Sequence, residues 1–288
     1  KAEEKAAKAQ LTENDLFVYA SGDKFSYEFS KKYGVFTSMV VDGEEQLDGR
    51  TQLSAFRAPI DNERGIKQYW LNLNVWEGEN LDCAFTKVYD CRIEDGDIVV
   101  EGSLAGISRL PLFKYTLKVT VFEDGKVDFK LSGDIRKDAH WLQRLGYVFE
   151  LPQSSQAFSY YGRGPIECYS DMCHWATVGM YDSTAEKEYV NYVFPQEHGN
   201  HNNVRMLRIG KLEFTADTEM EIQVSEYTAH DLYKATHTDE LKKDGKIHVR
   251  IDYKNSGVGS NSCGPILPEK YRLSEKTIEF GFSVKPIK

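Results

Sequence analysis

Hydrophobic and polar residues alternate along most of this chain, which is the pattern of a β-strand that buries one face. Residues 25–29 read Phe-Ser-Tyr-Glu-Phe, and residues 114–122 read Lys-Tyr-Thr-Leu-Lys-Val-Thr-Val-Phe. Similar runs cover residues 35–41, 91–94, 97–101, 126–131, 207–209, 212–215, 248–253 and 277–284. The pattern predicts a β-strand over each of these segments.

Short turn sequences follow or separate many of the predicted strands, namely Asp42-Gly43, Asp95-Gly96, Asp124-Gly125 and Gly210-Lys211. Asp-Gly suits a tight hairpin turn because both central residues need a positive φ, which Gly and Asp tolerate. Helical patterns are short, over residues 229–235 and 66–73. The sequence therefore predicts a large, all-β antiparallel sandwich.

The chain has 288 residues, which is enough to bury a substantial core, and large β-sandwiches often form one domain beyond about 200 residues. Residues 1–10 are a polar Ala/Lys/Glu stretch that we expect to be a linker or a frayed N-terminal segment. We expect residues 11–288 to form a single β-domain. Because the chain starts at Lys1 without a methionine, we also expect it to be a fragment of a longer protein.

Charge and composition narrow the classes of partner. The formal net charge is −9 at pH 7, and no dense Lys/Arg cluster opposes this acidic balance, which argues against nucleic acid and an anionic membrane as partners. No apolar run approaches the roughly 20 residues that a membrane-spanning helix needs. The five cysteines form no Cys-x-x-Cys pair and suggest no zinc-binding spacing, so we expect free thiols in a reducing compartment.

Three segments carry more polar and special residues than plain connections need. Residues 56–65 contain Arg57, Asp61 and Asn62 around a proline. Residues 160–171 contain Gly-Arg-Gly-Pro, which we do not expect inside a regular strand or helix, and present Arg163 and Glu167. Arg57 with Asp61, and Arg163 with Glu167, can alternatively be structural ion pairs.

The third segment, residues 195–205, concentrates Glu197, His198, His201 and several amides in what we expect to be a loop. Amides, imidazoles, carboxylates and nearby aromatic rings suit a sugar site, because sugars offer hydroxyls and an apolar C–H face. Glycoside hydrolysis needs two carboxyl groups at a defined separation, which the sequence does not show. A sugar-epimerising set could be drawn from His198, His201 and Glu197, but we expect no catalysis by this chain alone.

In order along the chain, four motifs resemble the C-terminal domain of the family 2 β-galactosidases. The first, residues 57–62, resembles the R-A-P-x-D-N signature, and the second, residues 161–171, resembles the G-x-G-P-x-E-x-Y-x-D motif. The third, residues 192–199, resembles the Y-x-x-P-Q-E-x-G segment. The fourth, residues 257–265, is similar to the closing loop of that domain and contains Asn261 and Cys263. The resemblance covers about residues 11–288.

The resemblance implies an antiparallel supersandwich related to the galactose mutarotase fold. It also implies a parent enzyme that hydrolyses terminal β-galactosides with retention. In the family, a separate barrel domain carries the catalytic glutamates and most metal ligands, so Mg²⁺ or Na⁺ would bind in domains outside this chain. By implication this chain has no cofactor of its own. It would wall the active-site cleft, contact the remaining domains, support a homo-oligomer, and lie in the bacterial cytoplasm.

The substrate-cleft candidates that follow from the motifs and the resemblance are Arg57, Asp61, Asn62, Trp76, Arg163, Glu167, Glu197, His198, Asn261 and Cys263. Cys263 stands where many family members have a tryptophan that stacks on substrate, and Trp76 lies where the family has a loop at the cleft mouth. Met172, His201 and Met206 also depart from common family residues. Two other functions stay open: a freestanding carbohydrate-binding module, and an aldose-epimerase-like enzyme.

Overall fold

The computed structural model describes residues 6–63, 65–71, 78–259 and 265–287. The strands are β1 (Leu11–Glu13), β2 (Phe17–Gly22), β3 (Phe25–Ser30), β4 (Val35–Val41), β5 (Glu44–Glu45), β6 (Gln52–Ser54), β7 (Ala84–Glu94), β8 (Asp97–Gly106), β9 (Phe113–Val121), β10 (Val127–Ile135), β11 (Arg144–Pro152), β12 (Ala157–Gly164), β13 (Thr177–Thr184), β14 (Asn200–Ile209), β15 (Leu212–Ser225), β16 (Lys246–Asn255) and β17 (Thr277–Pro286). The helical segments are α1 (Ala229–Lys234) and the 3-10 turns η1 (Asp61–Glu63), η2 (Lys67–Tyr69), η3 (Leu81–Cys83), η4 (Thr238–Glu240) and η5 (Glu269–Tyr271).

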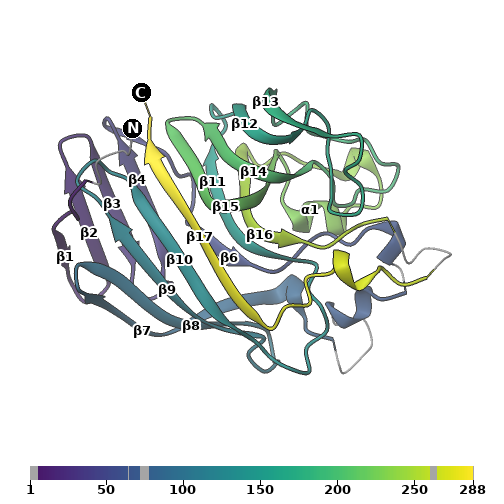
Figure 1. Cartoon of the computed structure of the whole chain (residues 1–288), viewed down its shortest axis with the longest axis horizontal. Helices are drawn as coiled ribbons and strands as arrows, with labels where there is room; N and C mark the ends of the chain where they lie inside the picture. Colours follow the sequence, from purple (N-terminus) through teal and green to yellow (C-terminus); the bar gives the residue numbers. More distant parts are fainter. Residues whose placement is uncertain (1–5, 64, 72–77, 260–264, 288) are drawn as a thin grey trace.

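The N-terminal strands form a small antiparallel sheet in the order β1-β2-β3-β4-β5 (Figure 1). The turn between β4 and β5 contains Asp42 and Gly43, with φ of 49° and 79°, and the turn between β7 and β8 contains Asp95 and Gly96, with φ of 52° and 76°. These positive values confirm the tight turns that the Asp-Gly pairs predict.

A larger antiparallel sheet runs in the order β13-β12-β14-β15-β17-β10-β9-β8-β7. Its longest strand, β15, divides between two neighbours: residues 212–216 pair with β17, and residues 221–225 pair with β16. Strand β16 then pairs with β11, and β11 pairs with the short β6. This branch brings the segment that follows β6 close to β16, and the first motif begins in that segment.

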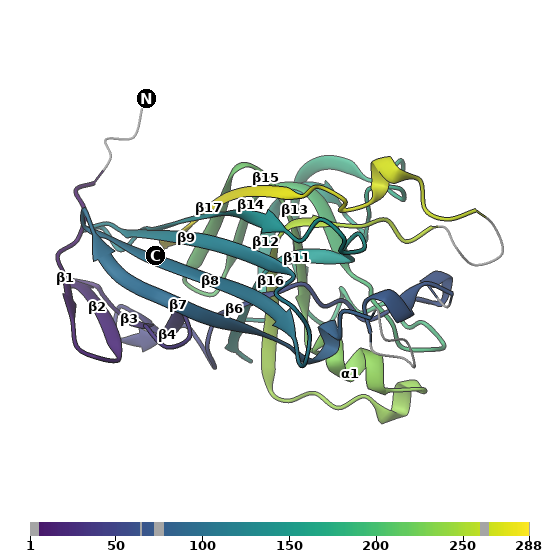
Figure 2. The same ribbon diagram turned by 90° about the horizontal axis from the view of Figure 1, so that it is seen from below.

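Aromatic side chains hold the two sheets together. Phe36 of β4 packs edge-on against Phe129 of β10, with ring centroids 5.8 Å apart, and Phe129 stacks on Phe282 of β17 at 4.5 Å. The hydroxyl of Tyr27 donates a hydrogen bond to the carbonyl of Gly125 at 2.8 Å. Figure 2 shows the small sheet lying beside the large one. The predicted all-β antiparallel sandwich is confirmed.

Part of the expected linker contacts the β9–β10 hairpin. The backbone NH of Ala9 donates to Val121, and that of Glu123 donates to Ala7, both at 2.9 Å. Lys8 forms an ion pair with the buried Asp97 at 2.8 Å. Residues 7–9 therefore pack against the β-domain that we expect over residues 11–288.

The two short helical patterns have different outcomes. Residues 229–234 form α1, which starts with a capping box between Thr228 and Asp231, an arrangement that satisfies backbone groups at a helix start. Of residues 66–73, the described part contains only the 3-10 turn η2. No helix within the described ranges is long and apolar enough to cross a membrane.

The expectation that Gly-Arg-Gly-Pro does not lie inside a regular strand holds only for Pro165, because residues 162–164 form the end of β12 and pair with β13. A Cβ on Gly162 would lie 2.6 Å from Val204, and one on Gly164 would lie 2.2 Å from the Tyr160 hydroxyl. The two glycines therefore leave room for neighbouring side chains that pack directly against this strand.

Candidate functional site

Arg57 is the first residue of the candidate site, and it is completely buried. Its Nη1 atom donates to the Asn255 side chain at 2.7 Å and to the Ser256 carbonyl at 2.6 Å. Its Nη2 atom forms an ion pair with Glu63. Arg57 thus joins the segment after β6 to the end of β16, although the two are far apart in sequence.

The alternative of an Arg57–Asp61 ion pair is wrong. The 3-10 turn η1 buries Glu63, which pairs with Arg57, and leaves Asp61 exposed. Glu63 also accepts hydrogen bonds from the Ile60 NH and the Gln143 side chain, each at 3.1 Å. The backbone NH of Asp61 instead donates to the Gln196 side chain at 2.9 Å, which links the first motif to the third.

Arg144 of β11 lies at the centre of a second buried group that the motifs do not reveal. Its guanidinium pairs with Glu197 at 2.9 Å and with Asp252 of β16 at 2.5 Å. Burial opposes its charge, but Asp252 and Glu197 outweigh burial and raise the pKa of Arg144. The signal in the sequence that could reveal this group is Arg144 itself, an arginine at the start of a largely apolar strand. A charge that such a strand buries needs partners of opposite charge.

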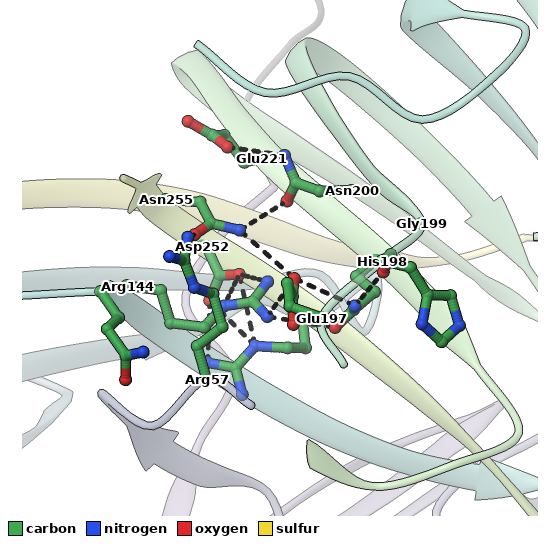
Figure 3. Close-up of polar contacts among 12 residues, drawn as sticks. Arg57, Arg144, Glu197, His198, Gly199, Asn200, Glu221, Asp252 and Asn255 are labelled. Carbon is green, nitrogen blue, oxygen red and sulfur yellow. Dashed lines mark hydrogen bonds and ion pairs between the residues drawn. The ribbon is translucent and has the colours of Figure 1, made fainter. Parts of the chain in front are cut away.

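Amide side chains extend this network toward β14 and β15 (Figure 3). Asn255 donates to Glu197 at 3.4 Å and to the Asn200 side chain at 3.3 Å. Asn200 donates in turn to Glu221 at 2.8 Å. Burial raises the pKa of Glu221 to about 7, against the opposing effect of the Asn200 hydrogen bond. Glu221 therefore changes charge near neutral pH.

The ion-paired charges inside the network balance. Three buried arginines face three buried carboxylates, and all six take part in ion pairs: Arg57, Arg144, Arg250, Glu63, Glu197 and Asp252. Removing one partner of such a group typically costs about 3–5 kcal/mol, because it leaves an uncompensated charge away from water. The network therefore fixes the relative positions of the segments that contribute to it.

The second motif attaches to the third and fourth through carboxylates. Glu167 accepts hydrogen bonds from the Gly199 NH at 2.7 Å and from the Tyr192 hydroxyl at 2.6 Å. Asp171 accepts from the backbone NH groups of Val258 at 2.9 Å and Gly259 at 2.7 Å. Each carboxylate thus binds the backbone of a different motif.

The alternative of an Arg163–Glu167 ion pair is also wrong. Arg163 lies on β12 and donates to the Asn203 side chain at 2.7 Å and to the Ala176 carbonyl at 2.9 Å. Glu167 lies past the end of that strand, where it binds the third motif. The two side chains therefore make different contacts, because the strand ends between them.

The histidines of the third segment do not form a catalytic set with Glu197. His198 is 3% exposed, and its Nδ1 atom contacts the Gln196 carbonyl at 2.9 Å. His201 lies on β14 rather than in the expected loop, and its Nε2 atom pairs with Glu188 at 2.8 Å. Since Glu197 pairs with Arg144, the three side chains serve separate partners.

A small apolar cluster also joins the motifs. Ile60 of the first motif, Tyr169 of the second and Val258 of the fourth pack together as a buried group apart from the main core. The Asn62 side chain donates to the Val258 carbonyl at 2.6 Å. All four motifs therefore meet in one region of the fold through both polar and apolar contacts.

Six of the ten cleft candidates are linked to this meeting point, namely Arg57, Asp61, Asn62, Glu167, Glu197 and His198. They differ in burial, since Arg57, Glu197 and His198 are at most 3% exposed. Arg163 lies apart on β12. The remaining candidates, Trp76, Asn261 and Cys263, lie outside the described residues.

The contacts of the carboxylates in this region suit the positioning of the motif segments better than proton transfer to a substrate. Four carboxylates in or next to the motifs are each held by an arginine, a hydroxyl or a backbone NH, namely Glu63, Glu167, Asp171 and Glu197. Within the described ranges, no group of three or more His, Cys, Asp and Glu side chains is placed to hold a metal ion.

Comparison with known proteins gives a consistent result. The family model described as β-galactosidase small chain matches residues 21–284. The chain is 30% identical to a β-galactosidase of Actinobacillus pleuropneumoniae over 279 residues, which are 96% of this chain and 27% of that protein. It is 31% identical to a β-galactosidase of Kluyveromyces lactis over 304 residues, covering 98% of this chain and 28% of that protein.

The chain thus spans about a quarter of the length of the β-galactosidases that it matches. Among solved structures, it is similar to one assigned to an aldose 1-epimerase of Escherichia coli K12, with a TM-score of 0.51 and 13% identity. That match covers 96% of this chain and 99% of the other. At this identity the likeness concerns the fold alone, and it confirms the galactose mutarotase-like supersandwich.

Proposed function

This chain belongs to the β-galactosidase small-chain family, and we propose that it is the C-terminal domain of a β-galactosidase and walls the substrate cleft of that enzyme. The parent enzyme would hydrolyse terminal β-galactosides with retention, using catalytic glutamates on another domain. The main support is the convergence of four motifs around one buried network. Such a network holds loops in a fixed arrangement, which a cleft wall requires.

The role of each candidate follows from its burial. Arg57, Glu197 and His198 act as positioning residues, because their polar groups are used inside the domain. Asp61 and Asn62 lie nearer the surface of the same region and are the better candidates for contact with substrate or with a neighbouring domain. Trp76, Asn261 and Cys263 stay candidates from the sequence.

The partners in this proposal are a galactoside, the remaining domains of the β-galactosidase, and a second copy of the enzyme in a homo-oligomer. The relatives support the second of these, since roughly three quarters of their length lies outside the matched region. We place any Mg²⁺ or Na⁺ in those domains. We also propose the cytoplasm as the location, in keeping with free thiols at Cys83, Cys91, Cys168 and Cys173.

Hydrolysis of a chromogenic β-galactoside tests the proposal. The purified 288-residue chain should show no turnover, and the same chain supplied with the remaining β-galactosidase polypeptide should restore it. Clear turnover by the pure chain alone would contradict the accessory role. Interconversion of galactose anomers by the chain would instead support the epimerase alternative.

A positioning role can be separated from a purely stabilising one in the assembled enzyme. Glu167→Gln keeps the size of the side chain but weakens its hydrogen bonds to Tyr192 and Gly199. We expect a lower kcat/KM, because the third motif is held less firmly, while the assembled enzyme stays folded. The control is Arg205→Met, since Arg205 is exposed and pairs only loosely with Glu219 at 3.3 Å. Equal kcat/KM values in both variants would argue against the proposed cleft wall.

A further inference from the structure

A short hairpin over residues 168–173 lies at the end of the second motif. Tyr169 and Met172 exchange two backbone hydrogen bonds, of 3.1 Å and 2.9 Å, across its two-residue turn. Cys168 comes directly before this pair and Cys173 directly after it. The two cysteines are therefore the next residues to face each other, at the open end of the hairpin.

The side chains of the two cysteines point to the same side of the hairpin. Tyr169 belongs to the small apolar cluster that joins the motifs, and Met172 packs against that cluster. Successive side chains of an extended chain alternate between its two faces. Cys168 and Cys173 therefore both lie on the face away from the cluster, where the thiol of Cys168 donates to the Asn202 side chain at 3.1 Å.

The backbone at Cys168 is oriented as in the closer kind of antiparallel pair. Its NH donates to the Asn200 carbonyl at 2.7 Å, and its carbonyl accepts from the Asn200 side chain at 3.0 Å. Both groups thus point away from the arm that carries Cys173, as in a non-hydrogen-bonded pair, where the Cα atoms are roughly 4.5 Å apart. A disulfide joins Cα atoms about 4.4–6.8 Å apart. The backbone geometry of the hairpin therefore suits a disulfide.

The two thiols differ in access to solvent. Cys168 is completely buried, and burial, with a smaller contribution from Cys173, raises the pKa of its thiol to about 11. Cys173 is partly exposed, and its sulfur lies 3.7 Å from the Ser170 carbonyl. An accessible cysteine beside a second, resolving cysteine is the usual arrangement of a redox-sensing pair.

We propose that Cys168 and Cys173 form a redox modification site that oxidised glutathione, or a similar small disulfide, converts into an intramolecular disulfide. The Cys173 thiol gives up its proton and attacks one sulfur of oxidised glutathione, whose S–S bond breaks to release one glutathione thiolate, which takes up a proton. The Cys168 thiol then gives up its proton and attacks the Cys173 sulfur, which releases the second glutathione as a thiol. Two cysteines are oxidised, and one oxidised glutathione is reduced to two glutathione molecules.

The disulfide would close the base of the hairpin that carries Asp171. The Asp171 carboxylate accepts hydrogen bonds from the backbone NH groups of Val258 at 2.9 Å and Gly259 at 2.7 Å, in the fourth motif. A covalent link across a loop removes many of its open conformations. Oxidation should therefore tighten the connection between the second and fourth motifs. The inference does not rest on the proposed function, because every contact belongs to this chain.

Mass spectrometry of the native 288-residue chain, treated with oxidised glutathione, tests the proposal. After alkylation of the free thiols, trypsin releases residues 164–187, which contain Cys168 and Cys173 and no other cysteine. We expect this peptide to carry no alkyl group and to be lighter than the reduced, unalkylated peptide by two hydrogen atoms. Dithiothreitol should reverse the change. In the oxidised chain, hydrogen exchange at the amides of Val258 and Gly259 should slow several-fold.

Single variants separate the two steps of the reaction. Cys168→Ser should take up one glutathione at Cys173 and stop there, whereas Cys173→Ser should leave the buried Cys168 unmodified. Cys83→Ser is the control, because Cys83 is an exposed cysteine in η3, and this variant should form the linked peptide like the parent chain. Circular dichroism establishes that each variant is folded.

The measurements on the parent chain decide the proposal even where a variant does not fold. The proposal is overturned if the native chain stops at the mixed disulfide with glutathione, or if Cys173 links to a cysteine other than Cys168. It is also overturned if the linked peptide forms only after unfolding in urea, or if the amides of Val258 and Gly259 exchange equally fast before and after oxidation.

Discussion

Replacing Arg144 by methionine tests whether the buried network determines the stability of this fold. The variant removes a fully buried positive charge that pairs with Glu197 at 2.9 Å and with Asp252 at 2.5 Å. Methionine has a similar length and no charge, so the main effect is electrostatic. Both carboxylates would then stay buried with fewer partners.

The structure sets the size of the expected loss. Breaking a buried ion pair from one side typically costs about 3–5 kcal/mol. Asp252 would keep Arg250, at 3.2 Å, and Glu197 would keep the amide of Gln223, at 3.1 Å. Because neither carboxylate is left without a partner, we expect the lower end of that range, about 3 kcal/mol in the free energy of unfolding.

Urea unfolding followed by circular dichroism measures this loss, with Arg205→Met as the control. Arg205 is exposed, so breaking its ion pair should cost about 0–1 kcal/mol. An equal cost in both variants would refute the reasoning.

Three further outcomes are expected. Glu221→Gln should remove a pH dependence of the stability. Burial raises the pKa of Glu221 to about 7, so the parent chain should lose stability as the pH rises from about 4.5 to 7. The variant should not lose stability over this range, and urea unfolding at several pH values measures the difference. Gly257→Ala should lower the free energy of unfolding by about 1–3 kcal/mol in thermal or urea unfolding, because a Cβ there would lie 2.4 Å from the carboxylate carbon of Asp171. Gly65→Ala is the control and should cost far less, because the space around Gly65 is open. Alkylation of the native chain, measured by mass spectrometry, should label the exposed Cys83 readily. Burial raises the pKa of Cys168 to about 11 and should protect this thiol until the chain unfolds. Equal labelling of the two cysteines would contradict the structure.

Local patterns predict the elements of this fold well. The alternation over residues 114–122 corresponds to β9, and the Asp-Gly turns at residues 42–43 and 95–96 have the positive φ values that tight hairpins need. The helix at residues 229–234 also follows from its local pattern. These features depend on neighbouring residues and on backbone sterics, which a sequence displays directly. The end of β12 escapes such prediction, because its glycines are required by packing against distant side chains.

The motifs identify which segments matter but not how their side chains are used. Proximity in sequence suggests that Arg57 pairs with Asp61 and that Arg163 pairs with Glu167, and both pairings are wrong. Arg57 instead pairs with Glu63 and contacts Asn255. A separation of four residues says little about contact where the chain is not helical, because the backbone direction sets where each side chain points.

The antiparallel β class, the tight turns and the resemblance to the β-galactosidase C-terminal domain follow from the order of residues alone. The common network beneath the four motifs, with Arg144 and Asp252 at its centre, follows from the three-dimensional arrangement. The reason is physical: a strand pattern records which side chains are buried, but the partner of a buried charge is set by which strands become neighbours. Here the branching of β15 toward β16 and β11 brings Arg144 and Asp252 together, although they lie 108 residues apart in sequence.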